Sequence, residues 1–205
     1  MIGKLTSFVV ISSMALAVLF VTFYKSSETL YSFKYQKIAL NNVYRAIYIP
    51  YDLPKPGPLL PGNILWPGRV AFDKSKVFFA LNSYEKSQIY QQISDQRLSA
   101  AQKLFKRGDF ELSVTTIEKS EKYLELALLE EKNVHKQGIN TVDLLGNISK
   151  ASLKHREIIE DMALNSPEDA RPMVNKTLDI TKKLFEETKI ALNEQKAPTF
   201  TNPFE

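Results

Sequence analysis

IPYDLPKPGPLLPGNILWPG, residues 49–68, divides the chain into two unlike parts. This block holds six of the chain's ten prolines and three of its seven glycines. Because proline fixes φ, lacks an N–H donor and biases the residue before it away from the α region, we expect the block not to be helical. The sequence therefore predicts an extended, semi-rigid neck over residues 50–72.

An uncharged apolar run, SFVVISSMALAVLFVTFY, precedes the neck at residues 7–24. Its 18 residues just meet the length that a helix needs to cross a bilayer. A cleaved signal peptide is the alternative, since Ala15-Leu16-Ala17 has the form of a cleavage site. Cleavage there would leave an apolar new terminus, so we expect an uncleaved transmembrane signal-anchor within residues 1–25. Its expected anchor residues are Ser7, Phe8, Val9, Leu19, Phe20 and Tyr24.

The net positive charge of the chain lies in its first 72 residues. Residues 1–72 carry seven Lys or Arg against two acidic residues, a balance of +5, while the remainder carries 20 basic and 21 acidic residues, a balance of −1. A nucleic-acid binder would concentrate basic residues on its folded domain, so we expect no nucleic-acid partner. The basic juxtamembrane segment, residues 26–49, suits an anionic lipid surface. It is interpreted either as an amphipathic helix near the headgroups or as a helical stalk.

The orientation in the membrane depends on two opposed rules. Lys25, Lys34 and Lys37 lie on the carboxyl side of the apolar run and favour a cytoplasmic domain by the positive-inside rule. Long domains are translocated largely regardless of charge, however, and a signal-anchor with a short lysine-bearing leader usually exports the domain on its carboxyl side. We expect a single-pass protein of the cell membrane with an extracytoplasmic C-terminal domain.

The second part of the chain predicts helices throughout. We expect a first helix over Lys74–Lys106 with Asp73 as its N-cap, a second from Asp109 to Gly138 and a third over Thr141–Leu164. A fourth helix opens at Ser166-Pro167, although Pro172 either kinks its start or marks its true beginning. The links are short, which forces neighbouring helices to run antiparallel. The fold class is all-α: a transmembrane helix, a proline-rich neck, an antiparallel bundle of three or four long helices over residues 73–195, and an irregular tail over 196–205.

Each expected helix carries one apolar stripe. In the second helix, the stripe steps by 4, 3, 7 and 4 residues through Phe110, Val114, Ile117, Leu124 and Leu128. His155 lies on the stripe of the third helix, where we interpret it either as a histidine at the boundary of the core or as a core histidine whose hydrogen bonds are satisfied, in preference to a ligand or a base.

Few residues of the sequence are arranged in a pattern that is typical of a catalytic or metal site. His135 follows Glu131 by four residues, so the two could share a face, but a metal ion needs further ligands. The paired Glu-x-x-His motifs of a di-iron bundle do not occur. The small residues Gly146, Ser149 and Ser152 could leave room for a ligand between helices. We expect no catalytic residues, no metal and no cofactor.

Trp66, the single tryptophan, stands in the neck between Leu65 and Pro67. It is either an interaction residue, together with Leu65 and Phe72, or a plug that packs the neck onto the first helix with Phe72. The large area of the indole favours the plug.

Two groups of motifs resemble a known family. Leu60-Pro61-Gly62 and Trp66-Pro67 precede a long helix, and Gly108-Asp109-Phe110 and Tyr123-Leu124-Glu125-Leu126-Ala127 come after it. This order resembles a bacterial family of uncharacterised membrane-anchored helical proteins, a domain of unknown function with a Leu-Pro-Gly…Tyr-Pro neck and a helical hairpin. Trp66 stands where that family tends to have tyrosine, and the neck is shorter. The resemblance covers residues 59–130 and implies location and shape, without a reaction.

A tetratricopeptide array is the other architecture that these residues suggest. Its pattern around Gly108 should recur after about 34 residues. Val142 stands at that distance, and nothing around it repeats the pattern.

These observations favour a non-enzymatic, membrane-tethered scaffold or protein-interaction module of the cell envelope, which binds a protein partner or itself. The alternative is an extracytoplasmic sensory bundle that binds a small ligand or lipid between its helices.

Overall fold

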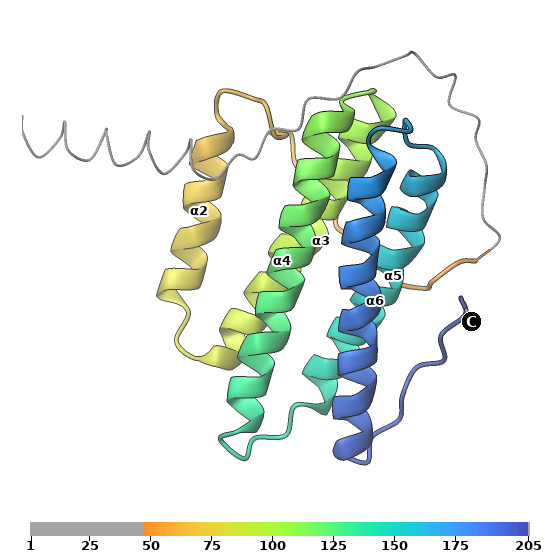
Figure 1. Cartoon of the computed structure of the whole chain (residues 1–205). Coiled ribbons are helices and arrows are strands. Elements are labelled where there is room, and N and C mark those ends of the chain that lie inside the picture. Colours follow the sequence, from red (N-terminus) through yellow and green to blue (C-terminus); the bar gives the residue numbers. More distant parts are fainter. Residues whose placement is uncertain (1–46, 205) are drawn as a thin grey trace, which may run out of the picture. The chain divides into compact units, whose positions relative to one another are not determined.

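A computed structural model describes residues 47–204, and in this range the chain forms five helices and no strand. They are α2 (Trp66–Phe79), α3 (Ser83–Lys106), α4 (Phe110–His135), α5 (Val142–Leu164) and α6 (Arg171–Glu194). Successive helices run in opposite directions, and α3–α6 form an antiparallel bundle of four long helices (Figure 1). The all-helical architecture is thus as expected. The expected transmembrane anchor and most of the juxtamembrane segment lie outside the described residues. Within residues 47–204, no helix combines the length and apolar character that crossing a membrane requires.

Small residues bring α3 and α4 close together at intervals of seven. The Ser87 hydroxyl donates to the carbonyl of Ala127 at 2.7 Å, and the Ser113 hydroxyl donates to that of Ala101 at 2.9 Å. Between these points, Ser94 and Ser120 each donate to the other's backbone carbonyl at 2.8 Å. A seven-residue spacing keeps one face of each helix turned toward its partner, as in a coiled coil.

Apolar clusters fill the bundle on both sides of its middle. One contains Leu98, Ile117, Ile159 and Val174, which come from all four long helices. The other contains Leu124, Leu145, Ile148 and Leu192 near the opposite end. Burial of these stripes supplies the main driving force for the fold.

The expected first helix is in fact two helices. It was predicted to run without interruption from Lys74 to Lys106, with Asp73 as its N-cap, but the chain turns between Phe79 and Ser83. Asn82 is the N-cap of α3, and its side chain accepts a hydrogen bond from the Glu85 amide at 2.8 Å. The Glu85 carboxylate in turn accepts from the Leu81 amide at 2.8 Å. This reciprocal pair resembles a capping box, and it starts a new helix where the sequence was interpreted as continuous.

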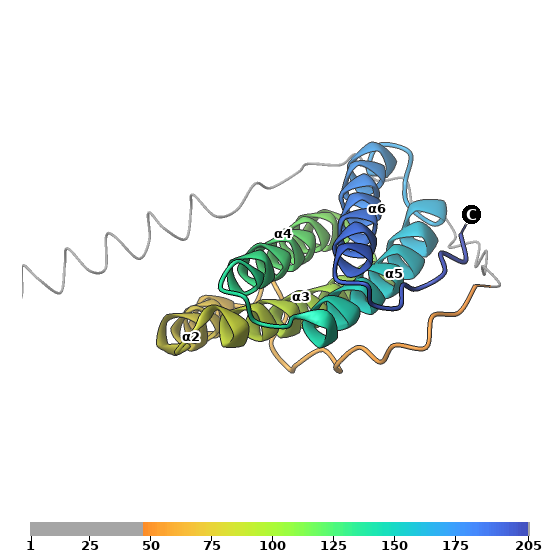
Figure 2. The same ribbon diagram turned by 90° about the horizontal axis from the view of Figure 1, so that it is seen from below.

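The prediction that the proline block contains no helix is wrong at its end. Residues 66–68 form the first turn of α2, because Pro67 stands at a first-turn position, where its missing N–H donor would have no helical partner anyway. The helix then packs beside α3, outside the four-helix bundle (Figure 2).

Pro172 marks the true beginning of the last helix. α6 begins at Arg171 and has proline in its first turn, so the expected opening at Ser166-Pro167 is a turn before the helix. Two other boundaries agree with the sequence. α4 begins directly after Asp109, and α5 ends at Leu164.

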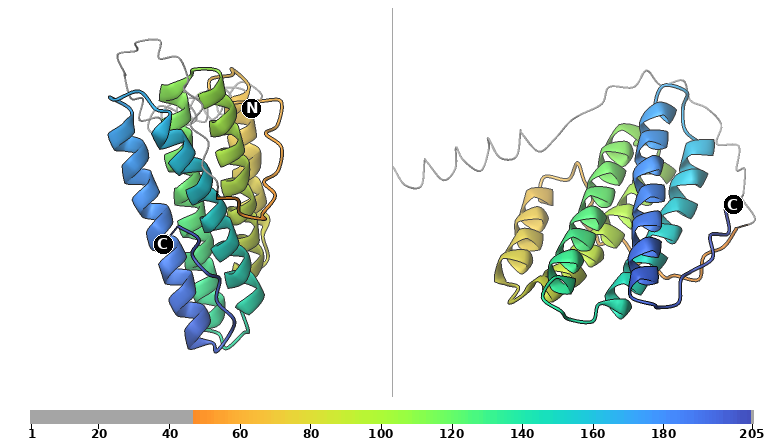
Figure 3. Two further views of the ribbon diagram at one scale, coloured as in Figure 1. Left: turned by 90° about the vertical axis from the view of Figure 1, so that its right-hand side faces the viewer. Right: turned by 60° about the horizontal axis from the view of Figure 1, so that its bottom comes forward.

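The rest of the neck is extended and lies along the bundle (Figure 3). Just before the neck, the Ile49 amide donates to the Glu157 carboxylate at 2.6 Å; within the neck, Leu60 is buried against Ala100 and Leu104. The sequence predicted an extended, semi-rigid neck, and the described neck is extended over most of its length and also packs on the domain. The irregular tail also packs back, since Phe200 joins an apolar cluster with Leu153 and Phe185.

Asn82→Ala tests the division between α2 and α3. Loss of the cap should reduce the free energy of unfolding by about 1 kcal/mol, because the first-turn amides of α3 lose their side-chain acceptor. Asn82→Ser is the matched control, since a serine hydroxyl can accept the same bond. Urea unfolding of the full chain, followed by circular dichroism, measures both. Equal losses in the two variants would show that the cap is unimportant.

Candidate functional site

The most elaborate polar site is centred on His155, which is completely buried in the middle of α5. Its Nδ1 lies 2.7 Å from Oε1 of Glu121 on α4. Its Nε2 lies 2.9 Å from Oδ1 of Asp95 on α3. The imidazole therefore links three helices, with one carboxylate at each ring nitrogen.

A second layer of hydroxyl groups completes the site. The Thr181 hydroxyl on α6 donates to Oε2 of Glu121 at 2.9 Å, and the Tyr51 hydroxyl from the neck donates to Oδ2 of Asp95 at 2.6 Å. The Gln91 amide group donates to the Tyr51 oxygen at 3.0 Å. All four long helices and the neck thus contribute to one hydrogen-bonded network, which we call the His155 network.

The carboxylates determine the charge of the ring. Burial by itself lowers the pKa of His155, but the charges and hydrogen bonds of Glu121 and Asp95 outweigh it and raise the pKa to about 9. At neutral pH the ring is an imidazolium that donates to both carboxylates. Burial and the neighbouring Asp95 also raise the pKa of Tyr51, so its hydroxyl remains a donor.

This geometry suits a structural role for His155 better than a catalytic one. Both ring nitrogens are engaged, and the ring has no contact with solvent, so His155 has neither a free lone pair nor access to a substrate. Within residues 47–204, no group of three or more His, Asp or Glu is arranged to hold a metal ion. Of the two residues spaced to share a helix face, Glu131 is buried and His135 is exposed. Burial is the main cause that raises the pKa of Glu131, and the charge of His135 acts on this carboxyl group in the opposite direction.

Sequence reasoning placed His155 on an apolar stripe, either at the boundary of the core or inside it, and the structure buries it completely; both of its partners were missed. Glu121 occupies the place skipped by the seven-residue step in the apolar stripe of α4, between Ile117 and Leu124. That gap was the available signal. A charged residue at a stripe position must be buried, and a buried charge needs a partner.

A second buried ionic group attaches α2 to the bundle. The Arg97 guanidinium is buried between the rings of Trp66 and Tyr123, with its central carbon 4.6 Å and 5.5 Å from their centroids. It pairs with the buried carboxylate of Asp73 at 3.2 Å, which also pairs with Arg69 at 3.2 Å. Burial lowers the pKa of Arg97, although Tyr123 and Asp73 act in the opposite direction.

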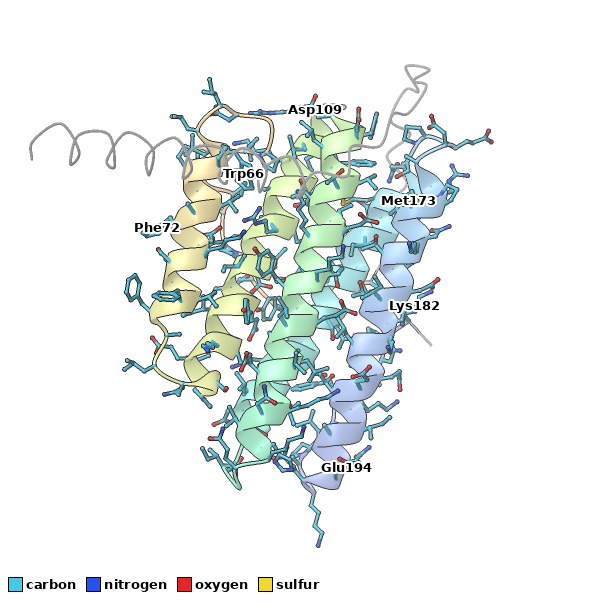
Figure 4. All side chains as sticks on the ribbon, turned by 60° about the vertical axis from the view of Figure 1, so that its left-hand side comes forward. Trp66, Phe72, Asp109, Met173, Lys182 and Glu194 are labelled. Atoms are coloured by element: carbon cyan, nitrogen blue, oxygen red, sulfur yellow. The ribbon has the colours of Figure 1, made fainter. Side chains whose placement is uncertain are left out.

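The three expected interaction residues separate into two kinds. Trp66 is 8% exposed and packs against α3 through Arg97, so it lies where a plug would lie. Phe72 is 57% exposed and points away from the bundle, so the expectation that it packs with Trp66 is wrong (Figure 4). The two residues lie six positions apart, which places them on different faces of α2. Leu65 is also exposed.

The small residues of α5 are covered by the tail. Phe200 lies against Gly146, whose added Cβ would stand 3.8 Å from the ring. The Ser152 hydroxyl donates to the Ser149 carbonyl at 2.8 Å, while the Ser149 hydroxyl is buried without a hydrogen-bond partner among the described residues. The side of α5 that could leave room for a ligand is thus occupied in part by the protein's own aromatic ring.

Comparison with known proteins identifies one family. Residues 58–169, more than half of the chain, match the model of a family described as Domain of unknown function (DUF5667). The matched range contains α2–α5 and ends just before α6. No curated protein and no solved structure matches the chain. The match agrees with the expected resemblance to an uncharacterised domain family, and it does not test the anchor or the neck motif.

Trp66→Ala should destabilise the protein by roughly 3 kcal/mol, because it removes a large buried ring and uncovers Arg97. Phe72→Ala is the matched control on the same helix. As an exposed position, it should change the free energy of unfolding by no more than about 0.5 kcal/mol. Thermal unfolding of the full chain by circular dichroism measures both variants. Similar melting temperatures for the two would show that Trp66 does not attach α2 to α3.

The His155 network predicts a pH dependence of stability. Because folding raises the pKa of His155 from 6.5 to about 9, the stabilisation is complete below pH 6.5 and is lost as the pH rises through 9. The loss should be roughly 3 kcal/mol, at about 1.4 kcal/mol for each pKa unit. Urea unfolding at a series of pH values measures it.

His135→Gln is the control for this measurement, because His135 is exposed and its removal should leave the pH dependence unchanged. His155→Gln should be less stable at neutral pH and should lose the dependence over the same range. A wild-type slope in the His155→Gln variant would contradict the charged state of the ring.

Proposed function

The chain belongs to the DUF5667 family, whose function is unknown, and from its own residues we propose that it is a non-enzymatic, membrane-tethered helical scaffold of the cell envelope. In this proposal, the domain is extracytoplasmic and is held by the apolar run at residues 7–24. The exposed face of α2 attaches the domain to another component of the envelope.

The observation that carries the proposal is the apolar surface of α2 and its ends. Large apolar side chains normally avoid such exposure when they gather in one place. Here the exposed group comprises Ile64, Leu65, Phe72, Phe78, Phe79 and Leu81, each between 57% and 91% exposed. We call these residues the α2 face.

The buried ionic groups support a scaffold role in a second way. The Asp73–Arg97 pair holds the opposite side of α2 against α3, so the α2 face is presented at a defined orientation. The His155 network links the four long helices beneath it. A rigid support with an apolar face is suited to attachment, and the sealed histidine is unsuited to proton transfer with a substrate.

Photo-crosslinking in native membranes tests the proposal. Benzoylphenylalanine placed at Phe79, within the α2 face, should form adducts with another envelope component in cells that make the full chain. The same group placed at Ile190 is the matched control, because Ile190 is an exposed apolar residue on α6. Adducts at position 79 no more abundant than those at 190 would exclude the α2 face as the attachment surface.

A further inference from the structure

The outward side of α2 alternates small and large residues. Four residues at steps of 4, 3 and 4 share this side of the helix: Gly68, Phe72, Ser75 and Phe79. Trp66 and Asp73, which lie two positions before Gly68 and Ser75, are buried toward α3. A shift of two residues turns about 200° around a helix, so the alternating stripe faces almost directly away from the bundle.

This stripe is complementary to its own reversed order. Its steps of 4, 3 and 4 are the same from either end, and reversal exchanges Gly68 with Phe79 and Phe72 with Ser75. Two α2 helices packed antiparallel would therefore set each phenylalanine of one copy against a small residue of the other. In a parallel pair, ring would oppose ring and small residue would oppose small residue. The stripe thus fits a second copy in one direction, with a twofold axis between the two helices.

Gly68 is not required by the fold of the described chain. Its backbone is helical, and a Cβ added there would meet nothing within 4 Å among the described residues. Glycine within a helix is destabilising relative to alanine, so a glycine that neither conformation nor internal packing requires calls for another explanation. Close approach of a ring from a second copy supplies one, because the missing Cβ leaves room for it.

The hydroxyl of Ser75 is already bonded within its own helix. It donates to the Phe72 carbonyl at 2.7 Å, so a ring placed over it would leave no buried donor without an acceptor. Phe78 widens the apolar surface, since its ring stands edge-on to that of Phe79 with 5.2 Å between the centroids. Ser75 can therefore serve as the small residue that receives a ring.

The α2 face is large enough for such a contact. An aromatic side chain buries about 200 Å² when it is fully covered, so the three phenylalanines, which are 57%, 81% and 75% exposed, present roughly 400 Å². Ile64, Leu65 and Leu81 add an area of similar order, which brings the face close to the roughly 800 Å² that each partner buries in an interface of standard size. A tether that confines both copies to one membrane raises their effective concentration further.

Charges of both signs border the apolar centre. The Nζ of Lys76 lies 4.8 Å from the centroid of the Phe72 ring, and just after the end of α2 the Glu85 carboxylate accepts from the Leu81 amide at 2.8 Å. An apolar core inside a polar rim is the usual anatomy of an interface between proteins. The shape of the stripe, and not the charge of its border, selects the occupant.

We propose that the chain forms a homodimer in which the α2 faces of two copies pack antiparallel, with Phe72 against Ser75 and Phe79 against Gly68 of the second copy. This inference rests on the proposed function and deepens it, because it names a second copy of the chain as the envelope component that the α2 face contacts. Since each helical residue rises about 1.5 Å, the two Ser75 residues lie about 4.5 Å apart along the helix axes, and the two Gly68 residues about 16 Å apart.

Single cysteines test the direction of the pair, because the chain has no cysteine of its own. At position 75 the two copies come within the reach of a disulfide, a Cα separation of about 4.4–6.8 Å, whereas at position 68 they do not. Membranes from cells that make the full chain in two differently tagged forms are treated with a mild oxidant. We expect Ser75→Cys to give several-fold more disulfide-linked dimer than Gly68→Cys or than Ile190→Cys, the matched control on the exposed side of α6.

Exchange of a small for a large residue tests the shape of the contact. In the Ser75→Cys chain, Gly68→Phe should lower the yield of dimer several-fold, because two rings would then meet at one level. Its urea unfolding should match that of the parent, since an added Cβ meets nothing within 4 Å among the described residues. Further addition of Phe79→Ala should restore the yield, because the new ring then faces alanine. Ile190→Phe should leave the yield unchanged.

Two results of these experiments would overturn the inference. Equal yields of dimer from Ser75→Cys and Gly68→Cys would indicate a parallel pair or random collision. An unchanged or higher yield from Gly68→Phe would show that the stripe does not pack against its own copy, and that added apolar area is favourable, as on a lipid surface.

The benzoylphenylalanine group at position 79 separates this inference from the proposed function. An adduct with residues around Gly68 of a second copy supports both. An adduct with a different envelope protein overturns the inference and leaves the proposed function standing. An adduct with residues 1–46 of the same chain, or no excess over position 190, overturns both.

Discussion

An imidazolium held between two buried carboxylates is the constraint on which the arrangement of the four long helices depends. A buried charge that loses its partner costs several kcal/mol, so α3, α4 and α5 must pack in the register that brings Asp95 and Glu121 to His155. Thr181 and Tyr51 extend the same requirement to α6 and to the neck. Apolar burial is non-directional, whereas this network requires particular donor and acceptor atoms of different helices to meet.

The ionic group around Arg97 connects the packing of the bundle to the exposure of one side of α2. Arg97 lies on α3, within the bundle, and reaches outward to Asp73 and Trp66 on α2. By holding one stripe of α2 inward, these contacts leave Phe72 and Phe79 on the opposite side, where burial within the domain is not possible. Exposure of the α2 face is therefore a consequence of packing on its other side. The neck is also fixed to the bundle, because the Tyr51 hydroxyl donates to Asp95 and Leu60 packs on α3.

Several elements of the fold could be predicted because local signals coincided with tertiary ones. α4 and α5 carry long apolar stripes, each interrupted by polar residues, and their ends lie close to Asp109, Gly138 and Thr141 as the sequence indicated. The division between α2 and α3 was missed because one apolar stripe was expected along the whole of Lys74–Lys106. The cap formed by Asn82 and Glu85 is a local signal that was present in the sequence but was outweighed by that periodicity. Trp66 could be assigned to the interior from its area, while Phe72 could not be placed without knowing where α2 begins.

The sequence by itself determined the helical class, the order of the long helices and the position of His155 on an apolar stripe, because these depend on spacing along one chain. Only the tertiary structure decided which charges meet. Asp95, Glu121 and His155 lie far apart in sequence, and their pairing depends on how three helices rotate and slide against one another. The same is true of α2, since a stripe of phenylalanines predicts burial until the opposite stripe is seen to be packed. The spacing of apolar residues shows which side chains share a face of a helix. Which of two apolar faces is buried depends on how the helix packs on its neighbours.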